Sequence, residues 1–245
     1  MRIRPPHPIT MTGPMNIVLI GCASLGKFGN DFYHRAMHEG HTVYSLSHAD
    51  HKLSDQRHVF APFDTTQSED GSIPIHTTYK QLIAEIDNID IFLYNSNNGA
   101  YPSDATALRS DGAVDLWAWK KSLDVQVVIP HILILESLKK MSSGSGIVFM
   151  TTGLSYDFSQ KNHEYSKYVG YAGLKGVQNH LMMGLAAHND KGAIATCVAP
   201  HFTYDDPGRY AIMFDRVYDY ITNLTAANNG KIRQIWPGAE SIDVN

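Results

Sequence analysis

Short, mostly apolar runs alternate with segments of helical period along most of this chain. Apolar runs of this length are typical of strands buried on both faces of a parallel sheet. They cover residues 16–20, 41–46, 58–63, 89–94, 146–150, 193–200 and 231–236. Helical period marks the segment that ends at Gly40 and residues 79–87, 114–140 and 171–188. The alternation predicts an α/β protein with a doubly wound parallel sheet of about seven strands.

The length of 245 residues suits a single domain of this kind. Its first residues are different, because Pro5, Pro6, Pro8 and Pro14 oppose a regular helix there. We therefore expect residues 1–14 to be a flexible N-terminal extension and residues 15–245 to form the folded domain. Met11 and Met15 stay open as alternative initiators.

Charge and composition narrow the classes of partner. The formal net charge of -4 provides no basic field, so we expect neither a nucleic acid nor a membrane as partner. No apolar run approaches the ~20 residues of a membrane span. The cysteines, Cys22 and Cys197, fall in predicted strands or strand ends, which fits buried thiols in a reducing cytoplasm. The sequence thus predicts a cytoplasmic protein, and it contains no metal-ligand spacing.

A glycine-rich turn follows the first predicted strand. Gly21, Ser24, Gly26 and Gly29 lie between that strand and a helical pattern. Backbone without side chains can approach phosphate groups closely, and the amides at a helix N-terminus face them. The turn therefore predicts a site for a nucleotide diphosphate, although a strand-end glycine turn without a ligand is the alternative.

Tyr171 and Lys175 are the pair on which a chemical prediction rests. Residues four apart on a helix lie on the same face, so the hydroxyl and the ammonium can point into one pocket. A nearby cation favours the phenolate, and lowering the pKa of a tyrosine by ~3 takes about 4 kcal/mol. Chance spacing of an isolated tyrosine and lysine is the alternative.

A functional pair and chance spacing are distinguished by the sequence around the two residues. From Tyr171 to His188 it reads YAGLKGVQNHLMMGLAAH. This segment resembles the active-site helix of the short-chain dehydrogenase/reductase superfamily, and the resemblance extends in divergent form over residues 15–238. It implies a Rossmann-type fold, with Tyr171 as general acid or base toward a carbonyl or alcohol. It also implies that Lys175 binds the nicotinamide ribose and lowers the pKa of the tyrosine.

The same resemblance assigns further cofactor contacts. It implies that Gly21, Gly26 and Gly29 lie against the phosphates, although the family's usual Gly-x-x-x-Gly-x-Gly is two residues shorter. Asp64 corresponds to the aspartate that contacts the adenine amino group. Asn95 and Ser96 fit the family segment along the cofactor, where Tyr94 and Asn97 depart from it. The last cofactor contact that the resemblance implies is Pro200, at the end of the sixth strand. It is followed by His201, where the family has glycine.

The resemblance also implies residues around the substrate. Thr152 would hydrogen-bond the substrate oxygen, with Ser155 as the alternative. Gln126 stands where the family has an asparagine that breaks the helix and holds a water of the proton relay. The segment 202–225 would form the substrate loop and its helix, with wall candidates Tyr204, Tyr210, Met213 and Phe214.

The end of the second strand bears on the choice of cofactor. An enzyme that prefers NAD would carry an acidic residue there to hold the ribose 2′-hydroxyl. Ser47 and His48 occupy this place and would tolerate a 2′-phosphate better than a carboxylate would. The sequence therefore favours NADP(H) over NAD(H) as the cofactor.

Together these residues predict reversible hydride transfer between NADP(H) and a small-molecule carbonyl or secondary alcohol. The resemblance further implies a homodimer or homotetramer, with the helix at 114–140 in the interface. Another class of function is a nucleotide-binding sensor or structural protein with little catalysis, motivated by the departures from the family pattern. A third hypothesis is an epimerase or dehydratase that uses the same tyrosine.

Overall fold

One sheet of eight strands forms the centre of the computed structural model, which describes residues 13–22, 28–47, 57–61, 72–96, 115–152, 169–201, 206–236 and 242–244. The order is β3-β2-β1-β4-β5-β6-β7-β8, and β8 alone pairs antiparallel. The strands are β1 (Asn16–Ile20), β2 (Thr42–Ser47), β3 (His58–Phe60), β4 (Ile91–Tyr94), β5 (Gly146–Met150), β6 (Ile194–Pro200), β7 (Ile232–Ile235) and β8 (Ile242–Val244).

The doubly wound parallel sheet predicted from the apolar runs is confirmed for the described part of the chain. The chain adds β2 and β3 on one side of β1 and then crosses to β4 on the other side, so strand order reverses between β1 and β4. The eighth strand was not predicted. Its pairing with β7 includes an ion pair between Arg233 and Asp243 at 3.0 Å.

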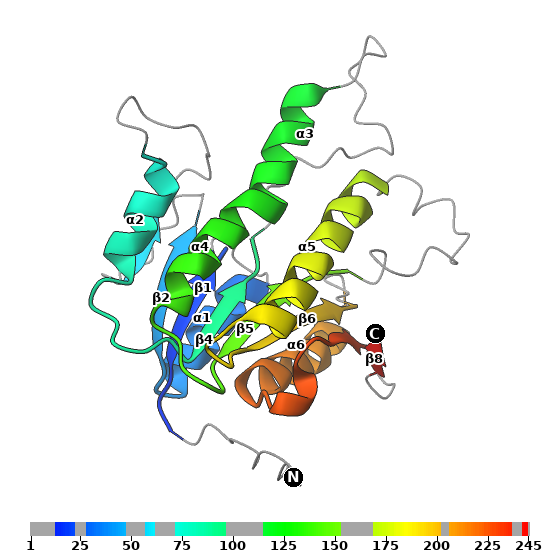
Figure 1. Cartoon of the computed structure of the whole chain (residues 1–245). Helices are drawn as coiled ribbons and strands as arrows, with labels where there is room; N and C mark the ends of the chain where they lie inside the picture. Colours follow the sequence, from blue (N-terminus) through cyan, green and yellow to red (C-terminus); the bar gives the residue numbers. More distant parts are fainter. Residues whose placement is uncertain are drawn as a thin grey trace, which may run out of the picture.

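Helices cover both faces of the sheet (Figure 1). One face packs against α1 (Phe28–His38) and α6 (Pro207–Thr222). The other packs against α2 (Pro74–Leu82), α5 (Val169–His188), the π-helical turn η1 (Asp124–Val128) and α4 (Ile129–Leu138). Helix α3 (Leu116–Leu123) precedes η1 and extends beyond the sheet (Figure 1). A short 3₁₀ turn, η4 (Ala226–Asn228), precedes β7. Because both faces are covered, β4 and β5 are buried at every position.

Helix α6 belongs to the core more than to a substrate wall. Met213 and Phe214, predicted as wall residues, are buried and pack with Phe28 of α1. Tyr210, another predicted wall residue, is partly buried and donates its hydroxyl hydrogen bond to Asp31 of α1. The apolar face of α6 therefore faces the sheet, and the assignments of Met213 and Phe214 are corrected. That of Tyr210 stays a prediction. Tyr204 lies outside the described residues.

Polar contacts also join α1 to α6. The Arg35 guanidinium lies 4.2 Å from the centroid of the Tyr218 ring and forms ion pairs with Glu39, at 2.9 Å, and with Asp215. Tyr218 donates a hydrogen bond to Glu39 at 2.9 Å. The charged guanidinium of Arg35 is tolerated in this contact because its side chain is 30% exposed and keeps contact with water.

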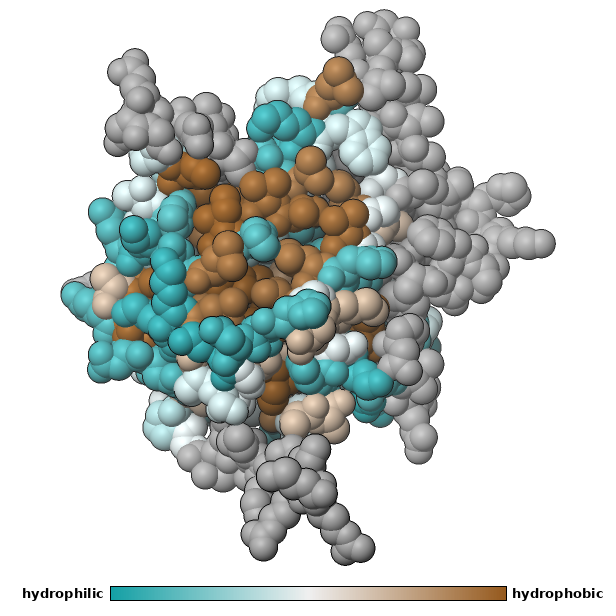
Figure 2. Space-filling view, viewed as in Figure 1, coloured by the Kyte–Doolittle hydropathy of each residue, from teal (hydrophilic) through white to brown (hydrophobic). Residues whose placement is uncertain are grey.

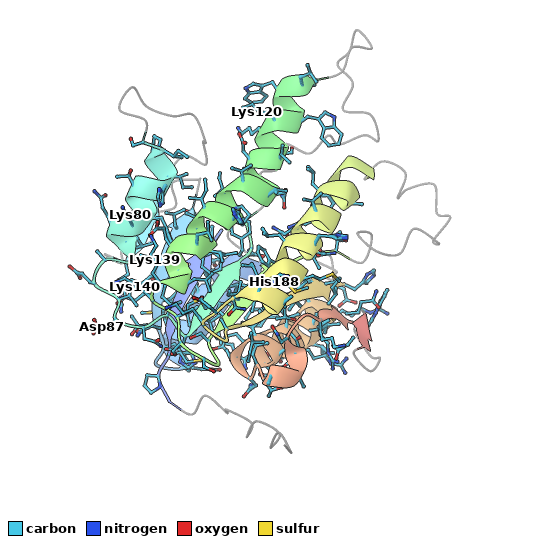
Figure 3. All side chains as sticks on the ribbon, viewed as in Figure 1. Lys80, Asp87, Lys120, Lys139, Lys140 and His188 are labelled. Carbon is cyan, nitrogen blue, oxygen red and sulfur yellow. The ribbon has the colours of Figure 1, made fainter. Side chains whose placement is uncertain are left out.

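The second helical segment begins earlier than predicted. Helix α2 covers Pro74–Leu82, whereas the periodicity predicted residues 79–87. Proline suits the first turn of a helix because it has no N–H to lose there. At the other end, Lys140 donates from Nζ to the carbonyls of Ala84 and Ile86, at 2.9 and 2.6 Å, just beyond α2. Figure 3 shows Lys139 and Lys140 near the end of α4, on the side of α2.

No helix in the described ranges is long and apolar enough to cross a membrane.

Candidate active site

The carboxyl ends of β1 and β4 meet at the point where strand order reverses, the usual place for a ligand in a doubly wound sheet. Gly21 follows β1 with a φ of +92°, and a Cβ there would lie 2.6 Å from the Ser96 Cα. Asn95 donates a hydrogen bond from Nδ2 to the Gly21 carbonyl at 2.9 Å. Only glycine therefore allows the two strand ends to approach this closely.

Gly29, in the first turn of α1, brings the helix to the same point. A Cβ at Gly29 would lie 2.3 Å from the Gly21 carbonyl oxygen and 2.6 Å from the Asn95 Nδ2. The helix N-terminus can thus lie directly against the strand end, which is the role of the last glycine in dinucleotide-binding turns. Ser24 and Gly26, the other residues predicted in this turn, lie outside the described part of the chain.

The residues predicted for the ribose and adenine are mostly beyond what the structure describes, since both His48 and Asp64 fall in undescribed segments. Ser47 is the last residue of β2 and is fully buried. A nucleotide could reach its hydroxyl only after neighbouring atoms move. Pro200 ends β6 and is partly exposed at the carboxyl edge of the sheet.

Tyr171 and Lys175 lie one turn apart near the start of α5, as their spacing predicted. The Lys175 Nζ is 5.8 Å from the centroid of the Tyr171 ring. The tyrosine is partly exposed, whereas the lysine is only 3% exposed. An ammonium at this distance from an aromatic ring is attracted electrostatically by the ring.

The Lys175 ammonium points into the protein. Its Nζ donates to the carbonyl of Met150, the last residue of β5, at 2.7 Å and to the Gln178 Oε1 at 3.0 Å. Burial lowers the pKa of Lys175 to about 7, and the nearby Cys197 opposes this shift. In turn, burial raises the pKa of the Cys197 thiol. The charge beside Tyr171 is therefore only partly present at neutral pH.

Thr152 is placed by the end of β5. The preceding residue, Thr151, is buried and donates its backbone N–H to the Val198 carbonyl of β6 at 2.8 Å. Thr152 is the first partly exposed residue after the strand. Since Lys175 binds the carbonyl of Met150, the start of α5 is held next to the same strand end. Ser155, the alternative to Thr152, is not among the described residues.

Gln126 lies in η1, and this π-helical turn has a visible cause. The Ile129 N–H donates to the Asp124 carbonyl, five residues back, and Pro130 has no N–H to donate to any carbonyl. The Val125 carbonyl instead accepts a hydrogen bond from the buried Tyr94 hydroxyl. Tyr94, a departure from the family pattern, therefore fixes the π-helical turn to β4. The segment predicted as one helix over residues 114–140 is therefore observed as α3, the π-helical turn and α4 in succession.

The carbonyl of Gln126 accepts a hydrogen bond from the Gln178 Nε2 at 3.0 Å. Both glutamines are almost completely buried, at 1% and 0% exposure. Gln178 thus contacts Gln126 and Lys175 together, and sequence reasoning missed it. Two signals were available: a glutamine three residues after Lys175 on the same helix face, and a proline four residues after Gln126.

At the other end of the sheet edge, His201 follows β6. Its exposed ring stacks on Trp236, which follows β7, with 4.7 Å between the ring centroids. The backbone N–H of His201 donates to the Ile235 carbonyl at 3.1 Å. Among the described residues, no cluster of three or more His, Cys, Asp or Glu side chains is suited to a metal ion.

Three features of this structure are those of the short-chain dehydrogenase fold. They are the doubly wound sheet, the glycines where β1 meets α1, and a Tyr-x-x-x-Lys helix against the end of β5. No protein-family model and no curated protein matches the chain. Solved structures do match it. A short-chain dehydrogenase from Salmonella enterica serovar Typhi CT18 has a TM-score of 0.67 at 16% identity, over 94% of this chain and 99% of that one.

Two further matches were solved with a nucleotide. A candidate short-chain dehydrogenase from Escherichia coli CFT073, complexed with NADPH, has a TM-score of 0.67 at 18% identity, over 94% of this chain and 99% of that one. A blue fluorescent protein from a metagenomic library, in complex with NADPH, has a TM-score of 0.66 at 14% identity, over 94% and 98%. The chain is therefore similar to short-chain dehydrogenases in fold and divergent from them in sequence.

Proposed function

We propose that this protein is a short-chain dehydrogenase/reductase that transfers a hydride reversibly between NADP(H) and a carbonyl or secondary alcohol. The observation that carries the proposal is the pairing of Tyr171 and Lys175, 5.8 Å from ring centroid to Nζ, beside the carboxyl end of β5. Structures of similar fold solved with NADPH support the choice of cofactor.

The glycine turn fits a dinucleotide. Gly21 and Gly29 let the end of β1 pack closely against the end of β4 and the start of α1. This packing brings the N-terminus of α1, where backbone amides favour phosphate, to the carboxyl edge of the sheet. Lack of an acidic residue at Ser47, the end of β2, favours NADP(H) over NAD(H). When bound, the nicotinamide supplies the redox chemistry, and the protein supplies position and electrostatics.

Each site residue then has a distinct part. Tyr171 donates a proton to the substrate oxygen in reduction and removes it in oxidation, because general acid-base catalysis needs a group whose pKa lies near the working pH. Lys175 contributes the positive charge that favours the phenolate and binds the ribose. Thr152 hydrogen-bonds the substrate oxygen. Gln126 contributes its backbone carbonyl to the hydrogen bonds that hold Lys175, through Gln178.

Binding and turnover test the proposal in sequence. Purified protein is titrated in parallel with NADPH and NADH by nucleotide fluorescence, and turnover is then measured on a panel of aldehydes and ketones. We expect preferential binding of NADPH and measurable reduction. Tyr171→Phe should bind NADPH like the wild type and lose nearly all turnover, while the control Tyr44→Phe, on β2, keeps both. Normal turnover by Tyr171→Phe would refute the assignment.

A second candidate is a nucleotide-binding protein with little catalysis. The inward position of Lys175 favours it, because both hydrogen bonds of its Nζ go to groups within the protein. The same panel distinguishes the two candidates. NADPH binding without turnover on any carbonyl would support a sensor or structural role, whereas absence of binding would exclude both.

We also propose that the protein forms a homodimer or homotetramer through the face that carries α3, α4 and α5. Figure 2 shows hydrophobic residues gathered over α4 and α5. Large apolar side chains at 42–74% exposure on these helices are Leu116, Trp117, Leu123, Leu135 and Val177. Sedimentation of Leu123→Glu should show dissociation, whereas Ile212→Glu on α6, at a similarly exposed site of 50%, should not. Equal sedimentation of both variants and wild type would contradict this interface.

A further inference from the structure

Gln178 connects the lysine of the candidate site to the π-helical turn on the neighbouring helix. Its Oε1 accepts from the Lys175 Nζ at 3.0 Å, and its Nε2 donates to the Gln126 carbonyl at 3.0 Å. From these contacts we infer that Gln178 is a positioning residue, which holds Lys175 in place and controls the protonation of its amine. The link to catalysis rests on the function proposed above; the link to Lys175 does not.

The carbonyl that receives the Gln178 amide belongs to the π-helical turn. It lies four residues before Pro130, which has no N–H to donate. Buried backbone carbonyls are nearly always hydrogen-bonded, and the Gln178 Nε2 donates to this one from α5. Gln178 therefore links α5 to the π-helical turn, across 52 residues of sequence.

The orientation of the Gln178 amide follows from its partners. The Lys175 ammonium has only donors and a carbonyl has only acceptors, so with a charged lysine Oε1 must face Nζ and Nε2 must face Gln126. Rotation of the amide by 180° would oppose donor to donor and acceptor to acceptor. Because Gln178 is fully buried, no water can compensate for that arrangement. The amide is therefore held in one orientation.

This fixed acceptor favours the charged form of Lys175. A hydrogen bond from an ammonium to a neutral acceptor is stronger than one from an amine, so it opposes the effect of burial. The titratable groups near the lysine are Tyr171 on its own helix and Cys197 on β6, and the Met150 carbonyl comes from β5. Gln178 thus helps to keep positive charge beside Tyr171, where the burial of Lys175 alone would remove it.

The test is a titration of Lys175 by NMR in the nucleotide-free protein with 13C-labelled lysine. The Cε signal that is absent from Lys175→Met identifies the residue. We expect Gln178→Leu to lower the pKa of Lys175 by about 1 or more, because one charge-assisted hydrogen bond is lost. Gln178→Glu should raise it by about 1 or more, because a carboxylate replaces the neutral acceptor. Gln234→Leu removes a buried amide from β7, on an element that does not carry Lys175, and should leave the titration unchanged.

Gln178→Leu and Gln178→Glu should shift the pKa of Lys175 in opposite directions, and a general loss of packing would not produce this result. If Gln178→Leu fails to fold, Gln178→Glu still gives the sign of the shift. A Lys175 pKa that is the same in wild type and Gln178→Glu would overturn the inference. The titration needs no nucleotide, so it distinguishes failure of the Gln178 inference from failure of the proposed function. Shifted titrations in a protein that binds no NADPH would refute the proposed function and leave the role of Gln178 standing.

In an active enzyme, the pH profile of kcat provides a second reading. The alkaline limb, where Lys175 loses its proton, should shift in the same direction as the pKa of Lys175 in both Gln178 variants, while the profile of Gln234→Leu matches the wild type. A profile that does not move, although the lysine titration does, would exclude the catalytic part of the inference.

Discussion

The buried lysine makes the stability of this protein depend on pH in a direction that can be worked out. Lys175→Met replaces an ammonium that is 3% exposed with an apolar side chain of similar length. Removing the charge eliminates the unfavourable burial of an ammonium, and it also removes the hydrogen bonds to Met150 and Gln178. The effect of the charge can be isolated because it alone depends on pH.

The magnitude follows from the pKa of Lys175, about 7 in the folded protein against the ordinary 10.5. Below about pH 7, folded and unfolded chains both hold the proton, and the folded state bears the whole burial penalty, about 5 kcal/mol for this shift. Between about pH 7 and about pH 10.5, only the unfolded chain stays protonated, so wild-type stability rises with pH. Lys175→Met lacks this dependence.

Urea unfolding of wild type and Lys175→Met at several pH values tests this reasoning. The free energy of unfolding of the wild type should gain on that of the variant by about 2 kcal/mol between about pH 7 and about pH 9. Lys191→Met, which removes an exposed lysine just after α5, should stay within about 0.5 kcal/mol of wild type at each pH. A constant difference between wild type and Lys175→Met over this range would refute the buried position of the ammonium.

Two further substitutions test the packing that supports the site. Gly29→Ala should lower the free energy of unfolding by about 1–3 kcal/mol, because a Cβ would meet backbone at 2.3 Å, whereas Gly184→Ala, with open space on α5, should raise it by about 0.5–1 kcal/mol. Equal effects in thermal unfolding would argue against the close contact of α1 and β1. Arg35→Met should cost about 1–2 kcal/mol through its ion pairs and its contact with Tyr218, and less at high salt. A loss that is independent of salt would assign the effect to packing alone.

Local patterns were enough to predict the sheet. Strands β1 and β5 were predicted at the residues where they occur, because a short apolar run next to glycine is typical of a strand buried on both faces of a parallel sheet. Gly21 and Gly29 were also recognisable as glycines between a strand and a helix, and the structure requires glycine at both because neighbouring protein atoms leave no room for a Cβ. Helix boundaries were predicted less well than strands. Helix α2 begins at Pro74, because a proline is favourable in the first turn of a helix, whereas the apolar period placed the start further on.

The placement of α6 could not be obtained from periodicity. Met213 and Phe214 stand on an apolar helix face, and such a face fits a substrate wall or a core equally well. The packing of that face against Phe28 and the sheet decided between the two. For the same reason, nothing local indicated that the hydroxyl of Tyr94 would hold the π-helical turn.

The chain by itself determined the doubly wound sheet, the glycine turn and the alignment of Tyr171 with Lys175 on one helix, because each depends on residues close in sequence. Tertiary structure alone decided what surrounds the lysine. Its burial, its bond to the end of β5 and its connection through Gln178 to the Gln126 carbonyl depend on segments that are up to 52 residues apart. Hydrogen bonds between distant segments depend on how helices pack on the sheet, and no spacing within a single helix contains that information.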